Sequence, residues 1–177
     1  VVLTATATEV TCFGDADAII TASATGGATI TVDGFAYDAA TTYGPGTYVV
    51  LASAANGNND GVCIDEITIT IGQPDEVVLT ATATEVTCFG DADAIITASA
   101  TGGATITVDG VAYDAATTYG PGTYVVLASA ANGNNDGVCI DEITITIGQP
   151  DEVVLTATAT EVTCFGDADA IITASAT

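Results

Sequence analysis

Apolar and polar side chains alternate with a period of two along most of this chain. In the opening segment 1–10, VVLTATATEV, Leu3, Ala5 and Ala7 fall on one face and threonines occupy the other. This alternation is typical of a β-strand with one buried face. The same pattern predicts further strands at 18–25, 28–34, 35–43, 46–54 and 66–72. We find no helical signal.

Turn residues separate these strands. They occur at Gly26-Gly27, Asp33-Gly34, Gly44-Pro45-Gly46 and Asn56-Gly57. Six or seven short strands with such turns predict an all-β fold, an immunoglobulin-like antiparallel β-sandwich. A β-solenoid is the alternative, but its rungs would recur every 20–30 residues or so, and none does. The inward faces are rich in alanine, so we expect a thin core. A tyrosine beside the Gly44 turn, Tyr43 or Tyr48, is expected to fix the corner before the next strand.

The whole pattern recurs with a period of 76 residues, since the opening VVLT of 1–4 returns at 77–80. We predict complete β-sandwich domains at 1–76 and 77–152. The segment 153–177 is then the first two strands of a third domain, and the repeats are expected to stack end to end.

The first two copies differ only at Phe35, which is Val111 in the second copy. Because both residues are apolar, this difference predicts tolerance in packing rather than a changed ligand site. Near-identical copies indicate an array that needs many equivalent units, whereas an active site is usually needed once.

Composition removes most chemistry from consideration. The chain has no Lys, Arg or His, and its 23 acidic residues give a net charge of −23. Without histidine or lysine the ordinary general bases are missing, so no enzymatic activity is expected. With no cation to neutralise phosphates, nucleic-acid binding is not expected. No apolar run reaches about 18 residues, so no membrane insertion is expected.

Three stretches together carry a family resemblance: VTCFGDADAIITASATGG, then GPGTYVVLASAANG followed by a cysteine, then ITIGQP. They resemble the SprB-type repeat of Bacteroidetes surface proteins over the whole repeat. Two departures are Ala28-Thr29, where the family often has Pro-Tyr, and the long Asn56–Cys63 hairpin in place of Asn-Gly-Cys. The resemblance implies very large cell-surface adhesins or filaments exported by the type IX secretion route.

The function predicted from these features is a structural repeat of a giant extracellular filament or adhesin, which gives length and stiffness for attachment at the cell surface. The expected partners are same-protein neighbours in a fibre or bundle, with a surface or cell target bound through other parts. The alternative is a direct binding module for glycan or ice, built on exposed Thr, Tyr and Asn side chains.

Five cysteines at regular spacing favour an oxidising compartment, and their pairing depends on the topology. We place the seam between domains at 73–76. Cys12 then follows the first strand and Cys63 precedes the last, at opposite ends of a sandwich roughly 25 Å long. Because a disulfide needs Cα atoms within about 7 Å, this topology favours Cys12–Cys139 across the seam.

Other pairings stay open at this point. Small secreted domains commonly carry an internal disulfide, which would give Cys12–Cys63 and Cys88–Cys139. A third pairing, Cys63–Cys88, would need the intervening segment to fold back as a hairpin.

Oxygen-bearing side chains are expected to gather at the same seam. They are Asp15, Asp17, Asp75, Glu76, Asn134, Asn135 and Asp136. Clusters of oxygen ligands suit Ca²⁺, so the seam is a candidate calcium site. The alternative is a plain turn, in which each aspartate caps its own backbone. No other cofactor is expected.

Overall fold

The structure is a computed structural model that describes residues 1–58, 61–133 and 137–177. These residues form strands and turns without a helix, and their strand pairs are antiparallel. The all-β prediction is therefore confirmed. No helix among them is long and apolar enough to cross a membrane.

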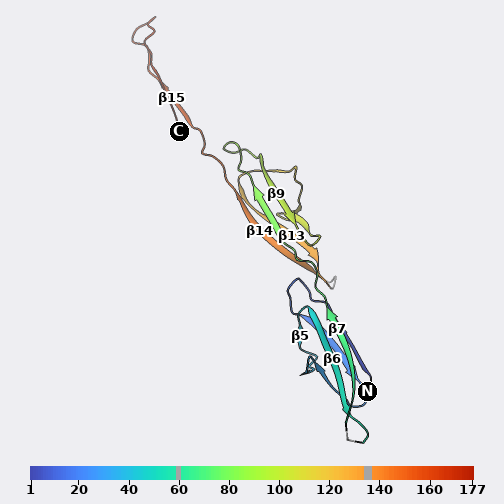
Figure 1. Ribbon diagram of the computed structural model, residues 1–177. Helices are drawn as coiled ribbons and strands as arrows, with labels where there is room; N and C mark the ends of the chain where they lie inside the picture. The colour runs from blue at the N-terminus through green and yellow to red at the C-terminus, as the bar shows by residue number, and fades with distance from the viewer. Residues whose placement is uncertain (59–60, 134–136) are drawn as a thin grey trace.

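The first unit folds as two facing sheets (Figure 1). Its strands are β1 (Leu3–Ala7), β2 (Ala18–Ala24), β3 (Thr29–Val32), β4 (Phe35–Ala36), β5 (Thr42–Tyr43), β6 (Gly46–Ala55) and β7 (Val62–Ile71). One sheet has the order β1-β2-β5 and the other β4-β3-β6-β7. This division of strands is that of an immunoglobulin-like sandwich.

The second unit repeats this arrangement. Its strands are β8 (Leu79–Ala83), β9 (Ala94–Ala100), β10 (Thr105–Val108), β11 (Val111–Ala112), β12 (Thr118–Tyr119), β13 (Gly122–Ala131) and β14 (Val138–Ile147). Even the register is kept, since Leu3 pairs with Ala24 and Leu79 with Ala100. The two units lie end to end (Figure 1).

A hairpin of β15 (Leu155–Ala159) and β16 (Ile172–Ala176) continues the same line beyond the second unit (Figure 1). It has the register of β1 and β2, with Leu155 opposite Ala176. The sequence ends before any counterpart of β3–β7, so Leu155 is 70% exposed where Leu79 is 4% exposed. The strands of the second sheet therefore bury this face in a complete unit.

The core follows the alternation of the sequence. On β1, Leu3 is buried and Thr4 is exposed, as predicted. Ile20 and Val50 are fully buried between the two sheets, and the fully buried Ala18 and Ala52 lie beside them. Two small alanines at this depth make the core as thin as the sequence indicated.

The expected single strand over 35–43 is wrong. The chain forms β4 in one sheet, turns, and forms β5 in the other sheet. The turn is built by Asp38, whose carboxylate accepts the Ala40 N–H at 2.9 Å and whose carbonyl accepts the Thr41 N–H at 3.0 Å. An aspartate that bonds its own backbone in this way is a common cause of turns, and here it carries the chain across the sandwich.

Two tyrosines tie the loops to the sandwich. The Tyr48 hydroxyl donates to the Gly44 carbonyl at 3.0 Å, which confirms the predicted corner tyrosine. The Tyr37 hydroxyl donates to the Ile20 carbonyl at 3.1 Å and accepts the Ala22 N–H at 3.2 Å. Tyr37 therefore fastens the crossing segment to β2.

Candidate functional site

The most distinctive site is the junction between the two units. Cys12, in the turn after β1, forms a disulfide with Cys139, near the start of β14, and their Cα atoms are 5.7 Å apart. This is the pairing across the seam. The bond joins the end of one sandwich to the facing end of the next.

Backbone contacts accompany the disulfide. The Gly133 N–H donates to the Thr11 carbonyl at 3.1 Å. A Cβ atom at Gly133 would lie 2.7 Å from the Val10 carbonyl oxygen and 3.5 Å from Pro74. The β13–β14 turn thus packs against the β1–β2 turn so closely that only glycine fits without movement. Asn132 beside it is 5% exposed.

The same turn of the first unit has no such neighbour. A Cβ atom at Gly57, the counterpart of Gly133, would meet nothing within 4 Å. Cys63 is exposed, whereas its counterpart Cys139 is 8% exposed. Identical sequences therefore have different environments, and the difference is made by the adjoining unit alone.

The remaining cysteines do not form the alternative pairs. Among the described residues Cys63, Cys88 and Cys164 carry free, exposed thiols. The internal pairs Cys12–Cys63 and Cys88–Cys139 are therefore absent, as is the hairpin pair Cys63–Cys88. The reason is the sandwich topology, which places the β1–β2 turn and the β6–β7 turn at opposite ends.

The residues around Cys88 are equivalent to those around Cys12, but no neighbouring unit covers them. They form a hollow of about 530 Å³, lined by Thr87, Cys88 and Phe89 on one side and Pro150–Val153 on the other. At the first junction the corresponding residues Thr11 and Pro74 lie against Gly133. The hollow therefore corresponds to the surface that Gly133 covers at the first junction.

The connection between units is also tied to the first unit. The side-chain oxygen of Gln73 accepts the Gly14 N–H at 3.1 Å, and Gln149 makes the same bond to Gly90. The seam at 73–76 thus borders the β1–β2 turn, where the disulfide begins. The same bond is present at the β8–β9 turn, where no further unit packs against Cys88.

Two of the predicted calcium ligands, Asp15 and Asp17, act as turn caps. Asp17 accepts hydrogen bonds from the Thr11 N–H, at 2.9 Å, and from the Thr11 hydroxyl. Asp15 accepts the Cys12 N–H at 3.0 Å. Both aspartates thus shape the turn that presents Cys12.

No cluster of three or more Cys, Asp or Glu side chains suited to a metal ion occurs in the described ranges. The structure therefore does not bring Asp15, Asp17, Asp75 and Glu76 together as a metal centre. Asn134, Asn135 and Asp136 lie outside the described residues. The calcium site stays a prediction.

Acid should loosen this turn. The hydrogen bond from the Thr11 hydroxyl, and then that from the Thr11 N–H, holds the pKa of Asp17 below its ordinary value. A carboxylate with a lowered folded-state pKa stabilises the fold above its unfolded-state pKa, and this contribution is lost as the pH falls through the folded-state value. We expect Thr11→Val to raise the pKa of Asp17 in a carboxyl-carbon NMR titration.

The second unit supplies the control for this titration, because Thr87 makes the same bonds to Asp93. Thr87→Val should raise the pKa of Asp93 and leave that of Asp17 unchanged. An unchanged titration of Asp17 in Thr11→Val would contradict the assignment of the shift to this hydroxyl.

The position that differs between the units lies on the surface, and the expectation that it reflects packing is wrong. Phe35 is 80% exposed and Val111 is 71% exposed. Both line the rim of a pocket in their unit.

The exposed threonines considered for glycan or ice binding form part of a hydrogen-bonded ladder. The Thr4 and Ser23 hydroxyls lie 2.7 Å apart, and Thr80 and Ser99 repeat the contact. These hydroxyls pair across β1 and β2. Binding through this face stays a prediction.

Comparison with known families bears on the turns that carry the junction cysteines. The sequence model of the SprB repeat matches residues 4–30 and 80–106. The chain carries SprB repeat segments. Each segment runs from β1 or β8 into β3 or β10 and contains one β1–β2-type turn, with Cys12 or Cys88. The predicted resemblance is confirmed over these residues, and SprB repeats indicate a repeat protein of the cell surface.

The SprB match covers less than a third of the chain and leaves β4–β7 and β11–β14 outside it. No curated protein and no solved structure matches the sequence.

Proposed function

We propose that this chain is a structural segment of a giant extracellular filament or adhesin, whose units transmit tension along a rod. The observation that carries the proposal is the Cys12–Cys139 disulfide, which joins the first turn of one unit to the last hairpin of the next. Export by the type IX route and attachment through other parts of the protein belong to the same proposal and rest on the resemblance.

The proposed load path uses only part of each unit. Tension enters through β1, crosses the disulfide from Cys12 to Cys139, and leaves along β14 toward β15. The segment from Cys139 to Cys164 contains most of β14, the connection, β15 and the start of the turn after it. In a longer array bonded in the same register, such segments would join end to end into a covalent track, and the rest of each sandwich would carry no tension.

Small-angle scattering tests the rod. The oxidised chain should scatter as an elongated particle with both sandwiches in line. Cys12→Ser should bend more freely at the junction and show a smaller maximum dimension, because only residues 72–78 and noncovalent contacts then connect the units. Cys63→Ser is the matched control and should scatter like the unmodified chain. A compact profile of the oxidised chain, with the sandwiches side by side, would overturn the proposal.

Lateral association into a fibre or bundle is part of the proposal. Apolar side chains stay exposed on the edge strand β7, at Val62 and Ile64, and again on β14 at Val138 and Ile140. The same patch therefore recurs once per unit along the rod. A net charge of −23 opposes contact between chains, so the association is expected to need salt or divalent cations.

A further inference from the structure

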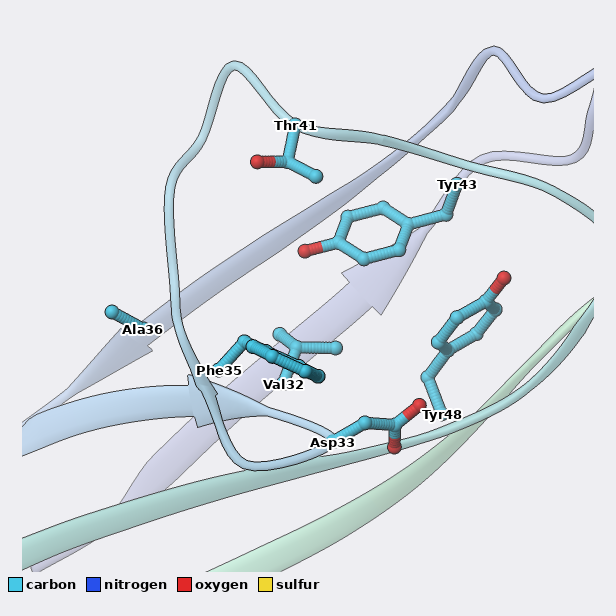
Figure 2. A pocket seen from close by; sticks show the side chains of 7 residues that line it. All are labelled: Val32, Asp33, Phe35, Ala36, Thr41, Tyr43 and Tyr48. Atoms are coloured by element: carbon cyan, nitrogen blue, oxygen red, sulfur yellow. The ribbon is translucent and has the colours of Figure 1, made fainter.

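Each complete unit has a pocket on its flank. In the first unit the pocket has a volume of about 330 Å³ and lies between the β3–β4 turn and the tyrosines of β5 and β6 (Figure 2). In the second unit the equivalent pocket has a volume of about 250 Å³. The larger volume lies within the range of small-ligand sites, about 300–1,000 Å³.

Aromatic rings form much of the first pocket. Tyr43 and Tyr48 pack edge to face with their centroids 5.1 Å apart. The Tyr48 hydroxyl is held by the Gly44 carbonyl, which fixes its ring. Figure 2 shows the Tyr43 hydroxyl pointing into the pocket between Thr41 and Phe35. Two packed tyrosine rings and an exposed phenylalanine give the pocket π-faces on more than one side.

The charge of the pocket is negative. Asp33 lines it, and one of its carboxylate oxygens accepts the Val49 N–H at 2.8 Å, which fixes the side chain in place. Burial raises the pKa of Tyr43, and repulsion from neighbours that include Asp38 and Asp33 raises it further. The chain contains no Lys, Arg or His, so no side chain of its own can neutralise this site.

Aromatic faces beside a carboxylate are the chemistry that recognises an organic cation. The ring faces attract the positive charge and also cover its apolar groups. A neutral sugar would use the rings but would not need the carboxylate. An anion would be repelled.

The one sequence difference between the two complete units falls in the lining of this pocket. Phe35 lines the first pocket, and Val111 replaces it in the second. Valine has no π-face, and the remaining lining residues of the two pockets correspond one to one. The chain therefore contains two versions of one pocket, one with an additional aromatic wall.

We propose that each of these pockets binds an alkylammonium group, and that the pocket with Phe35 binds it more tightly. The shared chemistry is a positive nitrogen on an apolar stem. It could be supplied by a free quaternary ammonium compound or by a lysine side chain of another protein.

An NMR titration of the oxidised chain tests this proposal. Choline and Nα-acetyl-lysine amide are the two probes, and they distinguish the quaternary ammonium source from the lysine source. Either probe should shift the ring signals of Tyr43 and Tyr48, and those of the second pocket at higher concentration. The affinity difference between the pockets should be about two- to fivefold, as for one exposed cation–π contact.

Two controls separate charge from shape. The uncharged isostere of choline, with carbon in place of nitrogen, should shift these signals far less. Asp33→Asn keeps the acceptor for Val49 and removes the charge, so it should weaken the first pocket and leave the second unchanged. Asp109→Asn should do the reverse, because Asp109 makes the same bond to Val125.

The natural difference gives the last pair of variants. Phe35→Val should lower the affinity of the first pocket to that of the second, and Val111→Phe should raise the second to the level of the first. Equal binding of the neutral isostere, or binding of N-acetylglucosamine without binding of either cation, would overturn the proposal. So would an Asp33→Asn variant that binds both cations as tightly as the unmodified chain.

Discussion

Stretching the oxidised chain from its two ends should release about 430 Å less contour length than stretching the reduced chain. The Cys12–Cys139 bond spans a sequence separation of 127 residues. A fully extended chain spans about 3.3–3.6 Å per residue, so the bond withholds roughly 430 Å from extension. The residues between the two cysteines carry no tension while the bond is intact.

Optical tweezers with handles at residues 1 and 177 measure this difference directly. Reduction should convert the short extension into the long one, with both sandwiches unfolding under load. Cys12→Ser should show the long extension without reductant. Cys63→Ser should keep the short extension, because Cys63 has a free thiol. Full extension of the oxidised chain would show that the bond is not in the load path.

The two units should also lose their independence in solution. A disulfide that closes a long loop stabilises a fold by about 2–4 kcal/mol. In the chain-entropy model it does so mainly by lowering the conformational entropy of the unfolded chain. Here the loop contains most of both sandwiches. When one unit unfolds, it therefore stays joined to the folded unit both by the connecting chain and by the disulfide.

Much of the fold could be predicted from the sequence because the strand period is explicit. Leu3, Ala5 and Ala7 alternate with threonine, and in the structure Leu3 is buried and the two alanines are half-buried, whereas the threonines are exposed. The β4–β5 crossing was missed since the segment 35–43 has β-forming residues throughout. The aspartate at its centre, Asp38, was the available signal, because aspartate commonly bonds its own backbone in turns.

Topology favoured the pairing of Cys12 with Cys139, because the two ends of a sandwich are too far apart for one disulfide, but the sequence left the internal and hairpin pairings open. The close contact at Gly133 could not be predicted. Asn132-Gly133 and Asn56-Gly57 are the same dipeptide in the same turn, and only the first packs against a neighbour. Because the contact is made by the adjoining unit, the sequence of the repeat does not distinguish Gly133 from Gly57.

The exposed position of Phe35 was also missed. An apolar residue that exchanges with valine suggests a core position, but a two-residue strand at the edge of a sheet exposes both of its side chains. Its place on a pocket rim depends on the crossing of 35–43, which brings Tyr43 beside Tyr48 of β6. Without the turn at Asp38, the pocket could not be predicted either.

Gly133→Ala should disrupt the junction, whereas the same substitution at Gly57 should not. The new methyl group would lie 2.7 Å from the Val10 carbonyl oxygen, which is fixed backbone, so the two turns must move apart. Strain of this kind costs about 1–3 kcal/mol. At Gly57 a Cβ atom meets nothing within 4 Å, and the lower entropy of the unfolded chain should leave stability equal or slightly higher.

The redox equilibrium of the Cys12–Cys139 pair reports this strain. In glutathione buffers of stepped ratio, Gly133→Ala should require about tenfold more oxidising conditions for half formation of the bond, because about 1.4 kcal/mol changes an equilibrium constant tenfold. Gly57→Ala should form it at the same ratio as the unmodified chain. The two glycines occupy the same place in turns of identical sequence. A change in the redox ratio that is common to both variants would therefore come from alanine in the turn itself. Equal shifts in both variants would mean that the adjoining unit does not press on Gly133, and the junction would then be held by the disulfide with little packing behind it.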